Sequence, residues 1–509
     1  MIASSTPSHN NIAVRITIDS VARILFIMAE VGYLRIYGDT VRALSAAGHD
    51  VRLGYNKAPA AGRDAHALDG LASEITTIGV VPEHGGPWRD SLISLGCTAD
   101  YVRFLSTREG TPYLRRRMEK YLPAGASWLR QVTSWPEFLV RALTRLAATV
   151  ERAVPVDPAL RDFIADQTAD AMVITPLVLR GPGGVQQTQL VKAARVLGMP
   201  VGLAVASWDH LSSKGLIRVD PDLVMVWNEV QKREAVASHA VPESRVTITG
   251  AQLFDLWFGR IPSLDRAAFL SRVGLSAQRP VVLYAGSSRG IISPEREIAF
   301  VRRWLDAIRR SVDPALQTAS VLIRPHLSNV NGWADIDLSD YGSVSIWPRQ
   351  RPVLPMNALE TSDYFHSLHY SAVVVGINTS AMIESVILDR PTCTVELPEY
   401  ADAQTGTKHF HYLVPAGGGP VESSRHLDAH LSHLSRALAE PRHGQAARRR
   451  FVEHFVRPHG LEQPAVDAVV AAIGHLARLR PQAMHGPPRW LAPARWLLKR
   501  ATWPAPPAG

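Results

Sequence analysis

The feature that most constrains the fold is a regular alternation of short apolar runs with helical patterns, along residues 23–255 and again along 280–480. The first stretch opens with the apolar run RILFIMA, an amphipathic segment that stops at Gly48, and a second run, DVRLGY. Continuous apolar runs of this length are typical of buried parallel strands, and the segments between them fit crossover helices. The pattern predicts an α/β protein with two doubly wound, Rossmann-like domains facing each other across a cleft.

The limits of the expected units follow from where the alternation starts, pauses and stops. A chain of 509 residues is too long for one ordinary core. We expect a flexible arm over 1–22, an N-terminal Rossmann-like domain over 23–255, a linker over 256–279, a C-terminal Rossmann-like domain with terminal helices over 280–480, and a basic tail rich in Trp and Pro over 481–509. A mostly helical insertion is expected at about 100–165, because Pro123, Pro136 and Pro155 interrupt helical segments there.

Composition excludes several classes of protein. No segment approaches the roughly 20 apolar residues of a membrane span, and no signal-peptide cleavage pattern follows the first apolar run. The two cysteines, Cys97 and Cys393, have neither the number of a disulfide framework nor the spacing of a metal site. The simplest expectation is a cytoplasmic protein.

The net charge of +9 is unevenly distributed. Residues 112–150 carry seven Lys or Arg against two Glu, and residues 481–509 carry four Lys or Arg and no acid. Basic segments of this kind indicate an anionic substrate or the anionic surface of a membrane, here its inner face. Solvated helix faces and a disordered tail are the alternatives. Nucleic acid is not expected as a partner, because no binding motif accompanies the charge.

The strongest candidate for a ligand site lies in the segment SAVVVGINTSAMIESVIL. Ligands of open parallel sheets bind outside the carboxyl ends of the strands. A strand ending at Gly376 is followed by Asn378 and by a helix start at Thr379 and Ser380, whose free amides suit a phosphate. Glu384, one turn later, could accept hydrogen bonds from ribose hydroxyls. Ordinary helix capping and a solvated glutamate are the alternative.

Two further strand ends in the second half carry candidate donor-binding residues. Arg324 and His326 follow the run ASVLI, and both could face a diphosphate. The small turn after PVVLYA could bring backbone amides close to a phosphate; it consists of Gly286, Ser287, Ser288 and Arg289. A surface ion pair, a solvated histidine and an ordinary loop are the alternatives.

In the first half, two strand ends suggest an acceptor side. The first is followed by Glu30, Gly32, Tyr33 and Arg35. The run PVGLAVAS is followed by Trp208, Asp209 and His210. Asp209 or Glu30 could act as general base on an acceptor hydroxyl. Alternatively, Asp209 caps the next turn and Glu30 anchors Arg35.

Taken together, these motifs resemble the GT-B superfamily of nucleotide-sugar glycosyltransferases, which includes UDP-N-acetylglucosamine 2-epimerases and CDP-glycerol-type polymer transferases. The opening ILFIMAEVGYLRIYGDTVRALSAAGHDV is similar to their first strand, turn and helix, and RVTITGAQLFD to the exit from their first domain. INTSAMIE is similar to the epimerase donor loop, and IRPHL to the His-Pro motif of GT-B sialyltransferases, with Leu327 where they have Pro. SWDHL and VWNEVQKREA are similar to segments of an uncharacterised bacterial GT-B-like group.

The resemblance implies transfer of a sugar from a nucleotide-activated donor to a glycan or lipid-linked acceptor in cell-envelope polysaccharide synthesis. It implies no metal and no resident cofactor, with His326, Asp209 and Glu30 as catalytic candidates. A 2-epimerase, a polyol-phosphate transferase and a non-catalytic scaffold of the same fold remain as alternatives.

Overall fold

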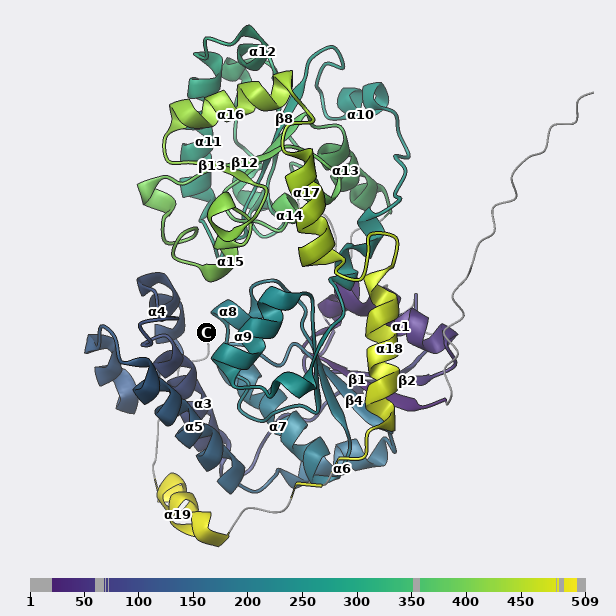
Figure 1. Ribbon diagram of the computed structural model, residues 1–509, viewed down its shortest axis with the longest axis vertical. Coiled ribbons are helices and arrows are strands. Elements are labelled where there is room, and N and C mark those ends of the chain that lie inside the picture. Colours follow the sequence, from purple (N-terminus) through teal and green to yellow (C-terminus); the bar gives the residue numbers. More distant parts are fainter. Residues whose placement is uncertain are drawn as a thin grey trace, which may run out of the picture.

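The computed structural model contains two parallel sheets, one in each half of the chain (Figure 1). The predicted α/β class with two doubly wound units is therefore confirmed. The structure describes residues 21–59, 68, 70–71, 73–350, 358–481, 483–484 and 489–500. The predicted arm lies, up to residue 20, outside the described residues, as do parts of the predicted tail. Within the described residues, every helix is too short or too polar to cross a bilayer.

The first sheet has seven strands in the order β3-β2-β1-β4-β5-β6-β7, all parallel. Its strands are β1 (Arg23–Met28), β2 (Asp50–Tyr55), β3 (Thr76–Val80), β4 (Ala171–Thr175), β5 (Val201–Ala204), β6 (Leu223–Val226) and β7 (Val246–Ile248). The central strands are buried along almost their whole length, because helices cover both faces. In this sheet only β3 was not expected from the sequence, since apolar and polar residues alternate little in it and its residues stay partly exposed.

The second sheet has six strands in the order β10-β9-β8-β11-β12-β13, also parallel. Its strands are β8 (Val281–Ala285), β9 (Ser320–Arg324), β10 (Val344–Ile346), β11 (Val373–Gly376), β12 (Thr392–Val395) and β13 (Glu422–Ser424). In each sheet the chain order reverses once, between β1 and β4 and between β8 and β11. Such switch points open a crevice at the carboxyl ends of the strands, which is where ligands of this architecture bind.

Helices on and around the first sheet include the predicted insertion. They are α1 (Leu34–Ala46), α3 (Arg89–Arg103), α4 (Pro112–Glu119), α5 (Glu137–Ala153), α6 (Pro158–Asp166), α7 (Pro182–Val196), α8 (His210–Ser213) and α9 (Glu229–His239), with a 3-10 segment η2 (Ala124–Gln131). The helical part begins with α3, earlier than the expected residue 100. Two of the three prolines immediately precede new helical segments, Pro123 before η2 and Pro136 before α5.

Helices of the second half pack mainly on the second sheet. They are α10 (Arg266–Arg272), α11 (Pro294–Arg309), α12 (Pro314–Gln317), α13 (Ala358–His369), α14 (Ala381–Ile387), α15 (Lys408–His411), α16 (Leu427–Ala439) and α17 (Gln445–Phe451). A π-helical segment, Val452–Val456, follows α17. The sequence pattern did not predict α13, whose apolar side chains alternate irregularly with Ser, Thr and His.

The last long helix, α18 (Ala465–Arg478), crosses back to the first sheet (Figure 1). Its residues Val469, Ile473 and Leu476 belong to the core that covers β1, β4 and α1. Asp255 ties this return: its carboxylate accepts from the amides of Ala465 and Val466 at 3.1 and 2.8 Å. We expected this helix among the terminal helices of the 280–480 unit, whereas its apolar stripe is buried by the other sheet.

Candidate functional site

The turn after β8 is held tightly against the turns after β9 and β11. A Cβ atom on Gly286 would lie 2.8 Å from the backbone nitrogen of His326, so only glycine fits this close approach. Ser287 is fully buried: its amide donates to Glu297 Oε1 at 2.7 Å, and its Oγ accepts from the Asn378 amide at 3.3 Å. Ser287 therefore joins two strand ends. Ser288 and Arg289 lie further out on the same turn, where Arg289 is exposed.

The turn after β11 leads into α14. Asn378 is buried, with its Nδ2 donating to the Ala403 carbonyl at 2.6 Å, and its Oδ1 has no partner within the described residues. Thr379 is buried and Ser380 exposed, and Ser380 makes no side-chain cap bond to α14. Of the two residues offered for ordinary capping, Ser380 makes no cap bond, whereas Thr379 Oγ1 accepts from the Ala381 amide at 3.5 Å. The amides at the start of α14 lie beside the Ser287 turn.

Arg324, at the end of β9, is a buried cation without a carboxylate in salt-bridge contact among the described residues. Its Nη1 donates to Ser367 Oγ at 2.9 Å, and its guanidinium lies 4.9 Å from the centre of the Tyr364 ring. Burial lowers the pKa of Arg324 to about 10, so the group stays charged at neutral pH. A buried cation stabilised mainly by hydroxyl, carbonyl and ring contacts can still accept an anionic ligand.

Glu384 in α14 is buried and accepts a hydrogen bond from the Tyr364 hydroxyl of α13. Burial raises the pKa of Glu384 to about 7, against the opposing effects of the Tyr364 hydrogen bond and the charges of Arg35 and Arg324. The alternative of a solvated glutamate is excluded. Tyr364 is one residue of the candidate site that sequence reasoning missed, because α13 itself was not predicted.

His326 follows Arg324 and faces the first domain. Its Nδ1 accepts from the Ser328 amide at 3.1 Å, which places the ring proton on Nε2. Burial, helped by the charge of Arg35, lowers the pKa of His326 to about 4, so the imidazole is neutral at pH 7. It can therefore act as a neutral hydrogen-bond donor through Nε2.

Arg35 is the group that connects the two halves electrostatically. We expected it on the acceptor side, with Gly32 and Tyr33. It lies in α1 of the first domain and is exposed, yet its charge acts on both His326 and Glu384 of the second. The structure thus brings Arg35 to the donor-side residues.

The remaining residues after β1 lie on the side of the first domain that faces the second. Glu30 has a half-exposed side chain, and its nearest cation is Lys57 at 3.8 Å rather than Arg35. Gly32 is exposed in the short turn before α1. Burial, with the charge of Glu30, raises the pKa of Tyr33 to about 12, and Asp209 contributes to this shift. Tyr33 therefore links the β1 turn with the β5 turn.

The turn after β5 holds Asp209 as a charged carboxylate. Asp209 accepts from Ser207 Oγ at 2.7 Å and lies 3.2 Å from the Lys214 ammonium. Burial, the largest single effect, would raise the pKa of Asp209, but the charge of Lys214 and weaker effects of neighbouring groups together hold that pKa well below its usual range. Trp208 packs edge-on against His409 of α15, with ring centroids 4.8 Å apart, so this turn also contacts the second domain.

Asp209 is surrounded by more positive than negative charge. Arg180 donates to the Ser213 carbonyl at 2.8 Å, and burial, together with the charge of Arg117, lowers its pKa to about 10. His210 is buried, its Nδ1 has no hydrogen-bond partner in the described part of the chain, and burial lowers its pKa to about 4. Sequence reasoning missed Lys214 and Arg180, although Lys214 lies only four residues after His210.

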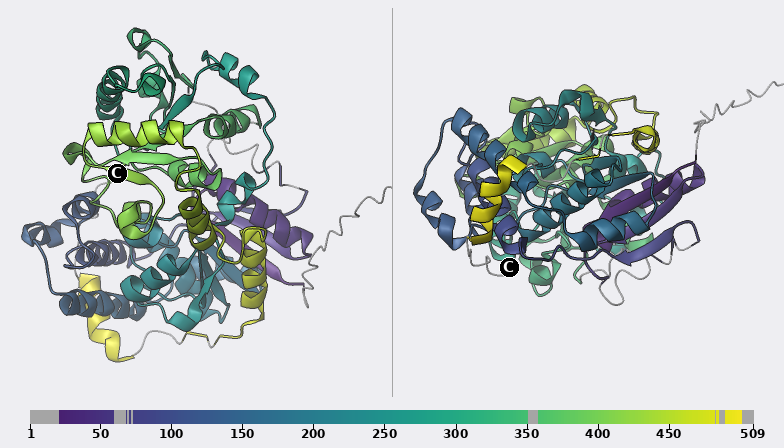
Figure 2. Two further views of the ribbon diagram at one scale, coloured as in Figure 1. Left: turned by 45° about the horizontal axis from the view of Figure 1, so that its top comes forward. Right: turned by 90° about the horizontal axis from the view of Figure 1, so that it is seen from below.

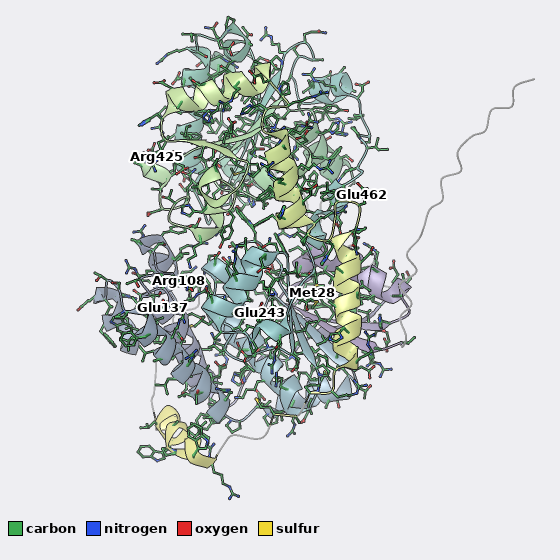
Figure 3. The ribbon with its side chains drawn as sticks, viewed as in Figure 1. Met28, Arg108, Glu137, Glu243, Arg425 and Glu462 are labelled. Carbon is green, nitrogen blue, oxygen red and sulfur yellow. The ribbon has the colours of Figure 1, made fainter. Side chains whose placement is uncertain are left out.

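The helical insertion reaches across to the second domain through α4. The Tyr113 hydroxyl donates to the Gly290 carbonyl at 3.0 Å, and Thr111 Oγ1 donates to the Gly406 carbonyl at 2.7 Å. Arg117 donates to Tyr113 at 2.9 Å. In Figure 3, Arg108 of the insertion and Met28 at the end of β1 both lie on the side of the first domain that faces the second. The insertion therefore bounds one side of the site.

Among the described residues, no group of three or more His, Cys, Asp or Glu side chains is arranged to hold a metal ion. The cations at the site are instead Arg35, Arg324, Arg117, Arg180 and Lys214, supplied by both domains.

Comparison with known proteins shows the fold. No protein-family model and no curated protein matches this chain. A solved structure assigned as a UDP-N-acetylglucosamine 2-epimerase from Listeria monocytogenes is similar to it with a TM-score of 0.50 and 10% identity, over 92% of this chain and all of the other. A glycosyltransferase from Rickettsia africae has a TM-score of 0.48 and 9% identity, over 90% of this chain and 99% of the other. A UDP-GlcNAc 2-epimerase from Neisseria meningitidis has a TM-score of 0.47 and 11% identity, over 89% and 99%.

Proposed function

The chain has the GT-B fold, and from this premise we propose that it is a glycosyltransferase. It moves a sugar from a nucleotide-activated donor to a glycan or lipid-linked acceptor in cell-envelope polysaccharide synthesis. The observation that supports this most is the convergence of Arg324, Glu384 and Arg35 at the switch point of the second sheet. Two cations around a buried carboxyl match a ligand that carries both phosphates and hydroxyls.

The second domain holds the donor in this proposal. Arg324 and the amides at the start of α14 bind the diphosphate, with Ser288 and Arg289 at its edge. Glu384 accepts hydrogen bonds from the ribose hydroxyls, and its burial beside Tyr364 fixes its orientation. His326 donates through Nε2 to a phosphate oxygen without carrying charge.

The first domain presents the acceptor. An acceptor hydroxyl oxygen attacks the anomeric carbon, the bond from that carbon to the phosphate oxygen breaks, and the electron pair leaves with the nucleotide diphosphate. Positive charge at Arg324 and Arg35 stabilises the leaving group. Glu30 takes the hydroxyl proton more readily than Asp209, because a carboxylate whose pKa is held well below its usual range is a weak base.

The chemistry around Asp209 suits an acceptor that carries phosphate. The charge of Arg117 lowers the pKa of both Arg180 and Lys214, beside the effect of burial, and Asp209 is the carboxylate among these cations. We further propose that no resident cofactor is used, that the sugar nucleotide is a co-substrate, and that the protein works in the cytoplasm in peripheral contact with the inner face of an anionic membrane.

A thermal-shift panel with UDP, GDP, CDP and TDP and their sugar conjugates tests the donor site. The nucleotide and sugar nucleotides of one base should raise the melting temperature of the wild type. Glu384→Gln and Arg324→Gln should each reduce that increase. Glu440→Gln, at an exposed carboxyl in a histidine contact, is the matched control and should keep it. Equal stabilisation of all four proteins would place the nucleotide elsewhere.

Product analysis then identifies the reaction. Incubation with the sugar nucleotide should give free nucleotide and an extended product only when a glycan or lipid-linked acceptor is present. Conversion of the donor sugar alone, without acceptor, would make the protein an epimerase. Transfer of a polyol phosphate would give a nucleoside monophosphate instead of a diphosphate.

A further inference from the structure

A basic cavity lies away from the strand ends that form the candidate site. It measures about 840 Å³ and is bordered by α5, the end of α9 and the segment before β6. Six arginines line it, namely Arg141, Arg145, Arg152, Arg195, Arg218 and Arg245, of which Arg218 is buried and paired with Asp100 and Glu151. Asp220 is the carboxylate at its wall, and Arg195 is already paired with Asp222 at 3.0 Å. The cavity therefore carries excess positive charge.

The arginines contributed by α5 form one row. Arg141, Arg145 and Arg152 are spaced four and seven residues apart, so at about 100° per residue they share one face of the helix. Arg145 is exposed and makes no salt bridge among the described residues, while Arg141 pairs with Glu137 within the helix at 2.9 Å. This row is where the basic surplus of residues 112–150 meets the cavity.

Bulky apolar side chains border this row on the same helix. Phe138, Ala142 and Leu146 are spaced at i, i+4 and i+8, next to the arginine face, and Phe138 and Leu146 are 74% and 58% exposed. Large apolar side chains so exposed in a regular stripe mark an interaction surface.

The C-terminal segment extends the same surface. Helix α19 (Ala492–Arg500) contacts α5, and Arg495 donates to the Ala153 carbonyl at 3.5 Å. Trp496 and Leu497 of α19 are more than half exposed. Figure 2 shows α19 beside the helices of the insertion, and in Figure 3 Glu137, at the start of α5, lies on the side of the molecule opposite to α1 and α18.

We propose that the exposed faces of α5 and α19, with the arginine cavity beside them, form a docking surface for an anionic phospholipid bilayer. Phospholipid head groups meet the arginines, and Phe138, Leu146, Trp496 and Leu497 enter the head-group region. A surface that combines aromatic and aliphatic side chains with arginine is complementary to anionic lipid. A soluble acidic polymer would bind the arginines but leave the apolar side chains exposed to water. The inference rests on the proposed membrane contact but not on the proposed transfer reaction.

Sedimentation of the full-length protein with vesicles tests this surface. Vesicles of phosphatidylcholine mixed with phosphatidylglycerol should bind the wild type, and vesicles of phosphatidylcholine alone should bind it weakly. Arg141→Gln with Arg145→Gln should lower the partition coefficient about fivefold for each arginine. Phe138→Ser with Leu146→Ser should lower it by about tenfold.

The matched control is Arg310→Gln with Val312→Ser, which makes the same chemical changes at exposed positions on the second domain. It should bind vesicles like the wild type. Equal binding by all variants, or an equal loss in the control, would overturn the proposal. Heparin serves as a soluble acidic probe. Heparin binding that requires the arginines, together with vesicle binding that does not require Phe138 and Leu146, would also overturn the proposal.

The thermal shift with nucleotide, measured on the same variants without vesicles, separates the two proposals. A retained nucleotide shift with lost vesicle binding assigns the defect to the docking surface. If the wild type binds vesicles but no nucleotide changes its melting temperature, the docking surface is supported and the proposed reaction is contradicted.

Discussion

Two carboxyl groups, Glu384 in the second domain and Asp209 in the first, are both largely buried, but their pKa values are shifted in opposite directions. The pKa of Glu384 is raised to about 7, whereas that of Asp209 is held well below its usual range. Burial acts on both in the same sense. Their neighbours differ: Asp209 has the Lys214 ammonium at 3.2 Å, and Glu384 has a phenol hydroxyl, with Arg35 and Arg324 acting on it more weakly.

The difference shows that a contacting cation, and not burial alone, decides the charge of a carboxyl at this site. Asp209 is a fixed negative charge that holds a group of cations together. Glu384 changes its protonation near neutral pH, and an anionic group bound at Arg324 would alter that equilibrium. Perturbed groups of this kind are common at functional sites, although structural networks also produce them.

The largest expected effect concerns the pH dependence of stability through Glu384. An unfolded glutamate has a pKa of about 4.3, and the folded value is about 7, so the folded state binds the proton more tightly. The stability that this carboxyl contributes is complete at low pH and is lost as the pH rises through 7. Because Gln does not titrate, the free energy of unfolding of Glu384→Gln relative to wild type should rise by about 3 kcal/mol between about pH 4 and pH 8. Urea denaturation at a series of pH values measures it.

Glu440→Gln is the control for this change, since that carboxyl is mostly exposed. Its curve should run parallel to that of the wild type. Parallel curves for Glu384→Gln as well would mean that folding does not shift the pKa of Glu384, and the opposite shifts of the two carboxyls would not hold.

The second test removes the cation that distinguishes Asp209. Lys214→Met leaves a carboxylate that is only 20% exposed without its partner 3.2 Å away, and should lower the free energy of unfolding by about 2 kcal/mol at pH 7. Asp209→Asn in the same chain should recover part of the loss. Lys232→Met, at a surface pair with Glu243, should change stability little. Additive losses in the double variant would show that the pair is not coupled.

A smaller effect is expected at His326. His326→Gln should weaken nucleotide diphosphate binding about tenfold, because a freely rotating glutamine amide replaces the imidazole Nε2 donor that the Ser328 contact holds in position. Since the pKa of His326 is about 4, wild-type affinity should show no step attributable to this imidazole between pH 6 and 8. Isothermal titration at both pH values measures this, with the exposed His443→Gln as control. A step near pH 6.5 that His326→Gln abolishes would show that the imidazole binds as a cation.

The smallest effect is expected from Tyr364→Phe. The Tyr364 hydroxyl lowers the pKa of Glu384 by bonding to its charged form. Its removal should raise the midpoint of the Glu384 transition by up to about one pH unit, or about 1 kcal/mol. Tyr370→Phe, one residue past the end of α13 and bonded to the Leu264 carbonyl, should leave the midpoint unchanged. A downward shift in Tyr364→Phe would contradict the direction assigned to this hydrogen bond.

Sequence patterns were sufficient for most of the fold and for the positions of the strand ends. They failed at β3, β13 and α13, where apolar side chains are too few or too irregular to show a period. The failure at α13 hid Tyr364, so Glu384 was identified without the group that orients it. Lys214 and Arg180 were not identified, because nothing in their spacing shows that they converge on Asp209. The assigned roles of the site residues and the domain limits stay predictions.

By itself, the sequence determined that this chain folds into two parallel α/β units, because the period of its apolar runs depends only on local geometry and burial. It also determined which residues stand at the strand ends. Only the tertiary structure decided the return of α18 to the first sheet, the approach of Arg35 to Glu384, and the opposite charge states of two similar carboxyls. These depend on side chains far apart in sequence, and electrostatic energy depends on their distances and on solvent exclusion, which no local pattern contains.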